Sequence, residues 1–174
     1  MTGLAVLQET LIFKGEDNPA LLRQIEAIRL AIWSDLTTVS VARKRFGLDQ
    51  PDDRAWHVVH FDENTIIAAG RLIIAESRSG VPDLCSLNPY LDLMEFPVGI
   101  MNRLFVNRTH RGKGIAQGII RERIKLAHEL GVFDLWVEAR SAAAPSLERH
   151  GFCDIGPSAD TSITGEWRIF RRHN

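Results

Sequence analysis

The residues best suited to chemistry in this sequence are six in a row, Arg-Gly-Lys-Gly-Ile-Ala, which span 111–116 between a predicted strand and a predicted helix. The first turn of a helix has backbone N–H groups without internal partners and the positive end of the helix dipole, so anions bind there favourably. Arg111 and Lys113 add positive charge. Gly112 and Gly114 have no Cβ, which lets phosphate oxygens reach the backbone N–H groups. We therefore predict that this loop binds a pyrophosphate.

Spacing distinguishes this loop from two familiar phosphate-binding loops. A nucleotide-hydrolase loop needs Gly-Lys followed by Ser or Thr, but Gly112-Lys113 is followed by Gly114. A dinucleotide fingerprint needs Gly-x-Gly-x-x-Gly, but Gln117 stands where the third glycine belongs. The segment instead fits Arg-x-x-Gly-x-Ala, and so resembles the (Gln/Arg)-x-x-Gly-x-(Gly/Ala) signature of the GNAT superfamily of acyl-coenzyme A-dependent N-acyltransferases. A loop that merely joins a strand to a helix is the alternative.

The resemblance implies that an acetyl group passes from acetyl-coenzyme A (acetyl-CoA), or another acyl group from its CoA thioester, to a primary amine of a small molecule or a protein. The amine would attack the thioester directly, without an acyl-enzyme. The pyrophosphate of CoA would bind the loop, its pantetheine arm would pair with the preceding strand, and a backbone N–H near Val106 would stabilise the oxyanion. The cofactor-binding residues implied are Leu104, Phe105, Val106, Arg111, Gly112, Lys113, Gly114, Ile115 and Ala116.

The catalytic groups depart from the family pattern. Many relatives carry a glutamate base where this chain has Asn102, which can hold a water but cannot accept a proton. The usual tyrosine acid is replaced by Leu147, so Tyr90, the only tyrosine, could serve instead if segment 77–98 folds over the thiol. Glu95 and Glu138 are alternative bases, and Glu138 could instead be a solvated carboxylate at a strand end. The candidate catalytic residues are thus Asn102, Tyr90 and Glu138.

Two other functions remain open from the sequence. The missing tyrosine and glutamate are compatible with a catalytically idle domain that only binds acyl-CoA. The proline-broken segment 77–98, with Arg29 and Trp33 near the front of the chain, also faintly resembles acyl-homoserine lactone and N-acyl amino acid synthases, which transfer longer acyl chains.

The composition of the chain limits the remaining classes of function. The chain has 174 residues and a net charge of −1, which suits one domain spanning 1–174 and gives no basic stripe for nucleic acid. Cys85 and Cys153 are isolated thiols, and no apolar run is long enough for a membrane span, so we expect a cytoplasmic protein. His57 and His60 would face opposite sides of a strand, and we expect no metal site. The sequence leaves the oligomeric state open, a homodimer included.

Hydrophobic periodicity supplies the elements that must position these residues. The predicted strands are 11–13, 56–61, 65–76, 99–106, 133–138, 152–155 and 166–172, and the predicted helices are 19–32, 39–46, 115–130 and 141–150. Gly70, inside a strand, predicts a bulge or a close backbone approach. The order indicates an α/β, single-domain, GNAT-like fold with a mixed, mostly antiparallel central sheet flanked by helices.

Three details of this assignment carry specific expectations. Asn18 and Pro19 read as the N-cap and first residue of the first helix. Within that helix we expect Arg29 to be solvated beside a core Trp33, with a substrate-facing role as the alternative. Segment 77–98 is too apolar for a linker, so it must either pack on the sheet or line a cavity.

Overall fold

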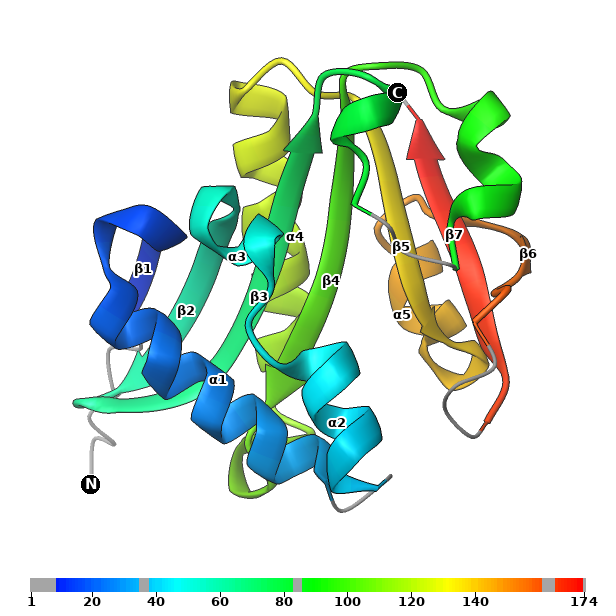
Figure 1. Cartoon of the computed structure of the whole chain (residues 1–174). Coiled ribbons are helices and arrows are strands. Elements are labelled where there is room, and N and C mark those ends of the chain that lie inside the picture. Colours follow the sequence, from blue (N-terminus) through cyan, green and yellow to red (C-terminus); the bar gives the residue numbers. More distant parts are fainter. Residues whose placement is uncertain (1–8, 35–37, 83–85, 161–164, 174) are drawn as a thin grey trace, which may run out of the picture.

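The structure, a computed structural model, describes residues 9–34, 38–82, 86–160 and 165–173. Its strands form one sheet in the order β1-β2-β3-β4-β5-β7-β6 (Figure 1). Neighbouring strands pair antiparallel except β4 and β5, which run parallel. The strands are β1 (Glu9–Lys14), β2 (Trp56–Asp62), β3 (Thr65–Ala75), β4 (Val98–Val106), β5 (Asp134–Arg140), β6 (Cys153–Pro157) and β7 (Trp167–His173). The predicted fold class is confirmed.

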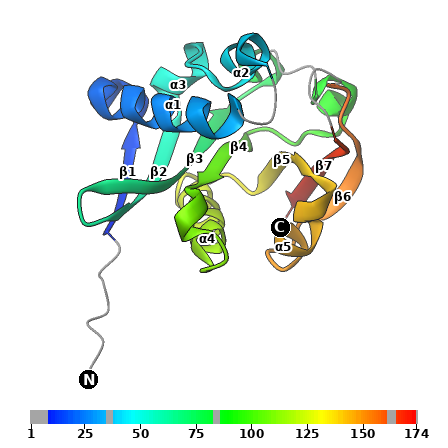
Figure 2. The ribbon, with the colours of Figure 1, turned by 90° about the horizontal axis from the view of Figure 1, so that it is seen from below.

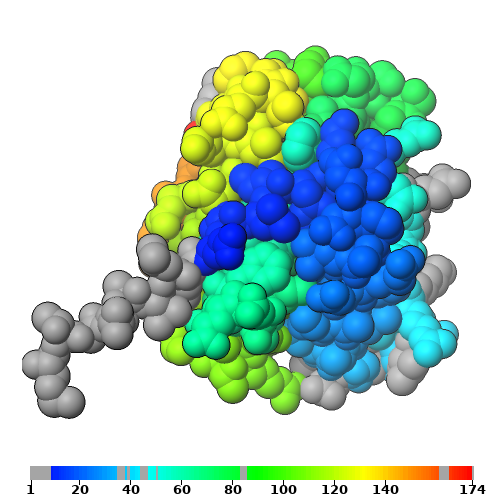
Figure 3. Space-filling model, turned by 90° about the vertical axis from the view of Figure 1, so that its left-hand side faces the viewer, coloured from blue at the N-terminus to red at the C-terminus, as the bar shows by residue number. Residues whose placement is uncertain are grey.

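Helices cover both faces of this sheet. One face carries α1 (Pro19–Ser34), α2 (Val39–Phe46) and α3 (Gln50–Arg54), and the other carries α4 (Ile115–Glu129) and α5 (Ala144–Glu148), as Figure 2 shows. Figure 3 views the β1 edge, where α1 in blue and α4 in yellow lie on the two sides of the sheet. No helix among the described residues is long and apolar enough to cross a membrane.

Local capping explains where the first helices begin. The Leu21 N–H donates to Asn18 Oδ1 at 3.1 Å, which confirms the predicted cap of α1. The short helix α3 lies in a polar stretch for which no helix was predicted. Asp49 caps it, and Asp52 accepts a hydrogen bond from the Asp49 N–H at 3.0 Å, forming a capping box.

The core lies on both faces of the sheet. The cluster under α4 joins Met101, Val137 and Phe170 to apolar residues of the helix, while Ile100, Trp136 and Ile169 project to the opposite face. Side chains alternate along each strand, so β4, β5 and β7 bury both of their faces.

The described part of segment 77–98 packs on the sheet, which is the first of the two predicted alternatives. Leu87 and Met94 are buried in the cluster around Trp136, on the side of α1 to α3. Leu93, by contrast, is 50% exposed. The segment therefore covers one end of the sheet rather than forming a separate unit.

Candidate active site

The predicted phosphate loop leads from β4 into α4. A 3₁₀ turn at Arg108–His110 follows β4, and Gly114 caps α4 with a φ of 78°. Gly112 has a φ of 77°, so both glycines occupy the left-handed region that other residues rarely adopt. A Cβ at either glycine would meet no protein atom within 4 Å. The helix N-terminus therefore faces open space.

A hollow of about 280 Å³ lies beside this loop. Its lining includes Arg111, whose Nε donates to the Val106 carbonyl at 3.0 Å and so fixes the side chain against the end of β4. Arg149, from the turn after α5, lines the same hollow. Lys113 is exposed on the loop outside this lining. Sequence reasoning missed Arg149, because no local signal links residues so far apart in the chain.

The strands β4 and β5 separate close to this loop, as Figure 1 shows, and we call this separation the split. Their parallel pairing runs from Val98 opposite Asp134 to Met101 opposite Val137, and the next residues are Asn102 and Glu138. Met101 and Val137 pack under α4. Because side chains alternate along a strand, Asn102 and Glu138 project to the opposite face, beside the point where the strands separate.

A β-bulge in β4 accompanies this separation. Ala69 of β3 pairs with Phe105 and Arg71 pairs with Asn102, so Gly70 alone stands opposite two residues of β4. One of those two, Arg103, has a φ of 54°, an uncommon and strained conformation for a residue with a side chain. The bulge bends β4 before Leu104–Val106, the segment predicted to bind the pantetheine arm.

Gly70 is confirmed as a position of both a bulge and a close approach. A Cβ there would lie 2.8 Å from Ile119 and 3.0 Å from the Arg123 guanidinium, both on α4. Arg123 is fully buried and donates to the backbone carbonyls of Arg71 and Asn102 at 3.1 and 3.3 Å. Burial lowers the pKa of Arg123 to about 9. This side chain therefore ties the phosphate-loop helix to the bulge.

On the other face, a network of buried charges holds the bulge. Arg103 donates from Nη1 to Asp52 Oδ2 and to the Gly47 carbonyl, both at 2.6 Å. Arg71 pairs with Asp52 at 2.9 Å and with Asp49 at 2.6 Å, and its Nε donates to Asn102 Oδ1. The strained Arg103 conformation is thus stabilised by ion pairs from α3.

Arg29 belongs to this network, so the expectation that it is solvated was wrong. Its side chain is 1% exposed and lies 3.8 Å from Asp52, which is itself fully buried. Burial lowers the pKa of Arg29 to about 10, and that of Arg103 to about 9. Burial raises the pKa of Asp52, but the arginines around it outweigh this effect and hold the pKa below its usual value. This role could not be predicted from the sequence, because hydrophobic periodicity shows which face of a helix is buried but not which residue of another element contacts that face.

The candidate base Glu138 is half-buried at the start of the split between β4 and β5. Ser158, which follows β6, donates its hydroxyl proton to Glu138 Oε1 at 2.6 Å and so orients the carboxylate.

Nearby in the fold, Trp33 of α1 and Trp167 of β7 face each other with ring centroids 6.0 Å apart. These two rings join the front helix to the second half of the sheet.

Comparison with known proteins identifies the family to which this arrangement of loop, bulge and split strands belongs. The family model described as Acetyltransferase (GNAT) family matches residues 22–152, which include the loop, the bulge and both split strands. The chain belongs to the GNAT acetyltransferase family. No curated protein matches the chain in sequence.

Solved structures confirm the GNAT fold. Escherichia coli ElaA is 13% identical with a TM-score of 0.71, the match covering 96% of this chain and 100% of ElaA. The AHL synthase LasI is also 13% identical with a TM-score of 0.71, covering 97% and 91%. The CoA-dependent acyl-homoserine lactone synthase MesI is 17% identical with a TM-score of 0.63, covering 95% and 88%. At these identities the likeness concerns the fold alone.

The predicted acid Tyr90 is held on a strand other than β4 and β5. Its hydroxyl donates to the Pro157 carbonyl at 2.7 Å on the edge strand β6. In the sheet order, β6 is separated from β4 by β5 and β7. The structure thus places Asn102 and Glu138 on neighbouring strands where β4 and β5 separate. The Tyr90 hydroxyl is held at Pro157, the residue directly before the Ser158 that donates to Glu138.

The two predicted strand histidines face opposite sides of the sheet, as expected. His57 lies 2.9 Å from the Asp52 carbonyl on the side of α3, whereas His60 lies next to Gly118 of α4. The described residues hold no group of three His, Cys, Asp or Glu side chains arranged for a metal ion.

Proposed function

We propose that this GNAT protein transfers an acyl group, acetyl in the simplest case, from acyl-CoA to the primary amine of a small molecule or a protein. The observation that carries this proposal is the split between β4 and β5, which begins beside Glu138 and lies next to the N-terminal end of α4. In this proposal, acyl-CoA would bind on one side of the split. On the other side, the Glu138 carboxylate would act on the acceptor amine.

The donor's pyrophosphate would bind at the N-terminus of α4. The open space beside Gly112 and Gly114 fits phosphate oxygens, which would accept from the backbone N–H groups there. Arg111 and Arg149, which line the adjoining hollow, would neutralise the remaining charge. The pantetheine arm would pair with the backbone of Leu104–Val106 beyond the bulge, as an added strand.

The acceptor amine would enter from the face of α1 to α3. Glu138, oriented by Ser158, would remove a proton from the amine as its nitrogen attacks the thioester carbonyl. Asn102 would position the amine or a water, because its Oδ1 already accepts from Arg71 and it cannot take a proton.

Collapse of the tetrahedral species would break the carbon–sulfur bond and release CoA as a thiolate. A backbone N–H near Val106 would stabilise the oxyanion before that step. The thiolate would take its proton from solvent, because the Tyr90 hydroxyl donates to Pro157. The products are an amide and CoA.

A second candidate is the same chemistry with a longer acyl chain. LasI and MesI, which share this fold, are acyl-homoserine lactone synthases by their descriptions. The Trp33–Trp167 pair beside the split would give such a chain an apolar wall. The third possibility is a domain that binds acyl-CoA without turnover.

A thiol-release assay with acetyl-CoA and octanoyl-CoA, each with a panel of primary amines, tests the proposal. We expect amine-dependent release of CoA, and a preference for octanoyl-CoA would identify the second candidate. Binding of acyl-CoA by calorimetry without thiol release for any amine would contradict the enzymatic function and support the idle domain.

The phosphate loop is tested by Gly114→Glu. The added carboxylate would stand where the pyrophosphate binds, so we expect CoA affinity to fall at least tenfold, about 1.4 kcal/mol, by titration calorimetry. Gly131→Glu is a matched control, because Gly131 has a φ of 76° and equally open surroundings at the other end of α4. Both variants carry the same backbone strain. Equal CoA affinities in the two variants would contradict the assignment of the loop.

A further inference from the structure

Tyr90 lies on the same face of the sheet as the candidate base. It belongs to the 3₁₀ turn Asn88–Leu93 in segment 77–98, and its ring packs beside Trp136 of β5 with centroids 6.3 Å apart. Trp136 projects to the face opposite α4. Glu138 follows two residues later on β5, so it projects to that face as well.

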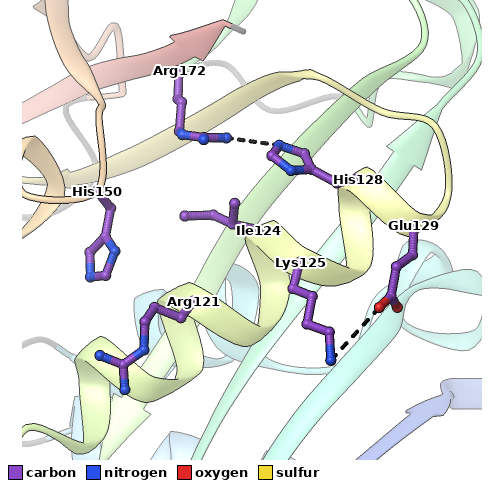
Figure 4. Close-up of a pocket in the computed structure, with 7 residues that line it drawn as sticks. All are labelled: Arg121, Ile124, Lys125, His128, Glu129, His150 and Arg172. Atoms are coloured by element: carbon purple, nitrogen blue, oxygen red, sulfur yellow. Dashed lines mark hydrogen bonds and ion pairs between the residues drawn. The ribbon is translucent and has the colours of Figure 1, made fainter.

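Two neighbouring arginines of β7 distinguish the faces of the sheet at this end. On the α4 face, Arg172 points toward His128, beside a hollow of about 440 Å³ (Figure 4). Arg171 projects to the opposite face, where its guanidinium lies 5.2 Å from the centroid of the Trp136 ring. Tyr90 and Arg171 thus pack against one fully buried indole, and this packing fixes the Tyr90 ring.

The Tyr90 hydroxyl reaches from this ring to β6. It donates to the carbonyl of Pro157, the last residue of that strand, at 2.7 Å. A Cβ at Gly156 would lie 2.5 Å from the hydroxyl oxygen, so this approach needs a residue without a side chain at that position. The segment 77–98 is therefore joined to the edge of the sheet by a directed hydrogen bond as well as by apolar packing.

The peptide between Pro157 and Ser158 is held at both ends. Its N–H donates to the Trp167 carbonyl of β7 at 2.9 Å. In a trans peptide the carbonyl points the opposite way, here toward the outer edge of the described sheet, where it accepts from Tyr90. Rotation of this peptide is thus restricted from two sides. Because the peptide directly precedes the Ser158 Cα, its orientation sets the direction of the Ser158 side chain.

Ser158 connects this peptide to the candidate base. Its Oγ accepts from the Asp160 N–H at 3.1 Å and donates to Glu138 Oε1 at 2.6 Å. The Asp160 N–H can only donate, so the Ser158 hydroxyl proton remains for the carboxylate. A continuous set of contacts therefore leads from the Tyr90 hydroxyl to Glu138.

We propose that Tyr90 is a positioning residue for acyl transfer, which fixes the Pro157–Ser158 peptide so that Ser158 keeps the Glu138 carboxylate in reach of the acceptor amine; the proposal rests on the acyl-CoA function above. In this role Tyr90 touches neither donor nor amine and transfers no proton. Without its hydroxyl, Ser158 gains other orientations, and the carboxylate is correctly placed for less of the time. The rate of the chemical step falls while acyl-CoA binds as before.

A double-mutant cycle in kcat tests the proposal. Tyr90→Phe keeps the ring beside Trp136 and removes only the hydroxyl, so we expect kcat to fall about fivefold, the scale of one hydrogen bond, with the KM for acyl-CoA unchanged. Adding Tyr90→Phe to Ser158→Ala should change kcat by less than about twofold, because both residues act through one contact. Ser79→Ala, which removes an exposed hydroxyl from the same segment, should behave as the parent.

Hydrogen exchange gives a readout that does not depend on turnover. The Ser158 amide should exchange at least about threefold faster in Tyr90→Phe than in the parent or Ser79→Ala, because its peptide has lost one of its two anchors. An unchanged exchange rate would show that the Tyr90 hydroxyl does not restrain this peptide and would overturn the proposal.

The kinetic outcomes that contradict the proposal are equally definite. A fivefold loss from Tyr90→Phe that persists in the Ser158→Ala background would show that the hydroxyl acts independently of Ser158. A Tyr90→Phe kcat equal to that of the parent would leave the hydroxyl without a role in turnover. A loss much larger than that of Ser158→Ala would assign Tyr90 a direct part in the reaction. Absence of amine-dependent thiol release by the parent would instead refute the proposed function itself.

Discussion

Glu138→Gln is expected to lower kcat at least a hundredfold while leaving the KM for acyl-CoA unchanged. Removing a general base typically costs between about a hundred and ten thousand in rate. Glutamine keeps the size of the side chain and can still accept from Ser158, but it cannot take the proton of the amine. In the proposed function the donor binds on the other side of the split, so we expect its affinity not to depend on this carboxylate.

Steady-state kinetics over a range of pH provide the measurement. Glu148→Gln, an exposed glutamate on α5, is the matched control and should behave as the parent. Ser158→Ala should keep activity within about tenfold, because the carboxylate remains. A Glu138→Gln kcat within a few-fold of the parent would assign the proton to water.

Asp52→Asn is expected to destabilise the protein by about 3–5 kcal/mol, because it removes the buried negative charge that compensates neighbouring arginines. For a domain of this size such a loss lowers the melting temperature by about 10 °C. Thermal and urea unfolding would measure it. Asp53→Asn, the exposed neighbour on α3, makes the same chemical change and should stay within about 0.5 kcal/mol of the parent.

The pH dependence of this loss has a definite sign. Because the pKa of Asp52 is lowered in the folded protein, its contribution is complete above the unfolded value of 3.8 and is lost as pH falls through the folded value. The stability difference between the parent and Asp52→Asn should therefore be constant between about pH 5 and 8 and shrink below about pH 4. A variant that melts within 2 °C of the parent at pH 7 would contradict a stabilising role for this charge.

The network also links stability to the site. Arg103 adopts its positive φ while its side chain is held by Asp52 and the Gly47 carbonyl. Without Asp52, that strain loses a compensating ion pair, and the bulge that bends β4 before Leu104–Val106 would relax. We therefore expect Asp52→Asn to raise the KM for acyl-CoA even at temperatures where the protein stays folded.

The sequence by itself determined the local features. The strand, loop and helix around Arg111–Ala116 were predictable because glycine conformations, helix N-termini and apolar periodicity act between residues close in the chain. The cap at Asn18 was confirmed for the same reason. Gly70 was recognisable because a glycine inside a strand marks a bulge or a close approach, but its partners come from β4 and α4. The family signature in the loop also led to the fold.

Tertiary structure alone decided which distant residues meet. The bulge at Arg103 depends on the carboxylate of Asp52 from α3, and the burial of Arg29 depends on the same carboxylate. Arg149 lies beside the phosphate loop because the turn after α5 brings it there. The ring of Tyr90 packs by Trp136 of β5, and its hydroxyl donates to the Pro157 carbonyl of β6. Ion pairs and core packing form between elements far apart in sequence, and no pattern along one element specifies its partner on another.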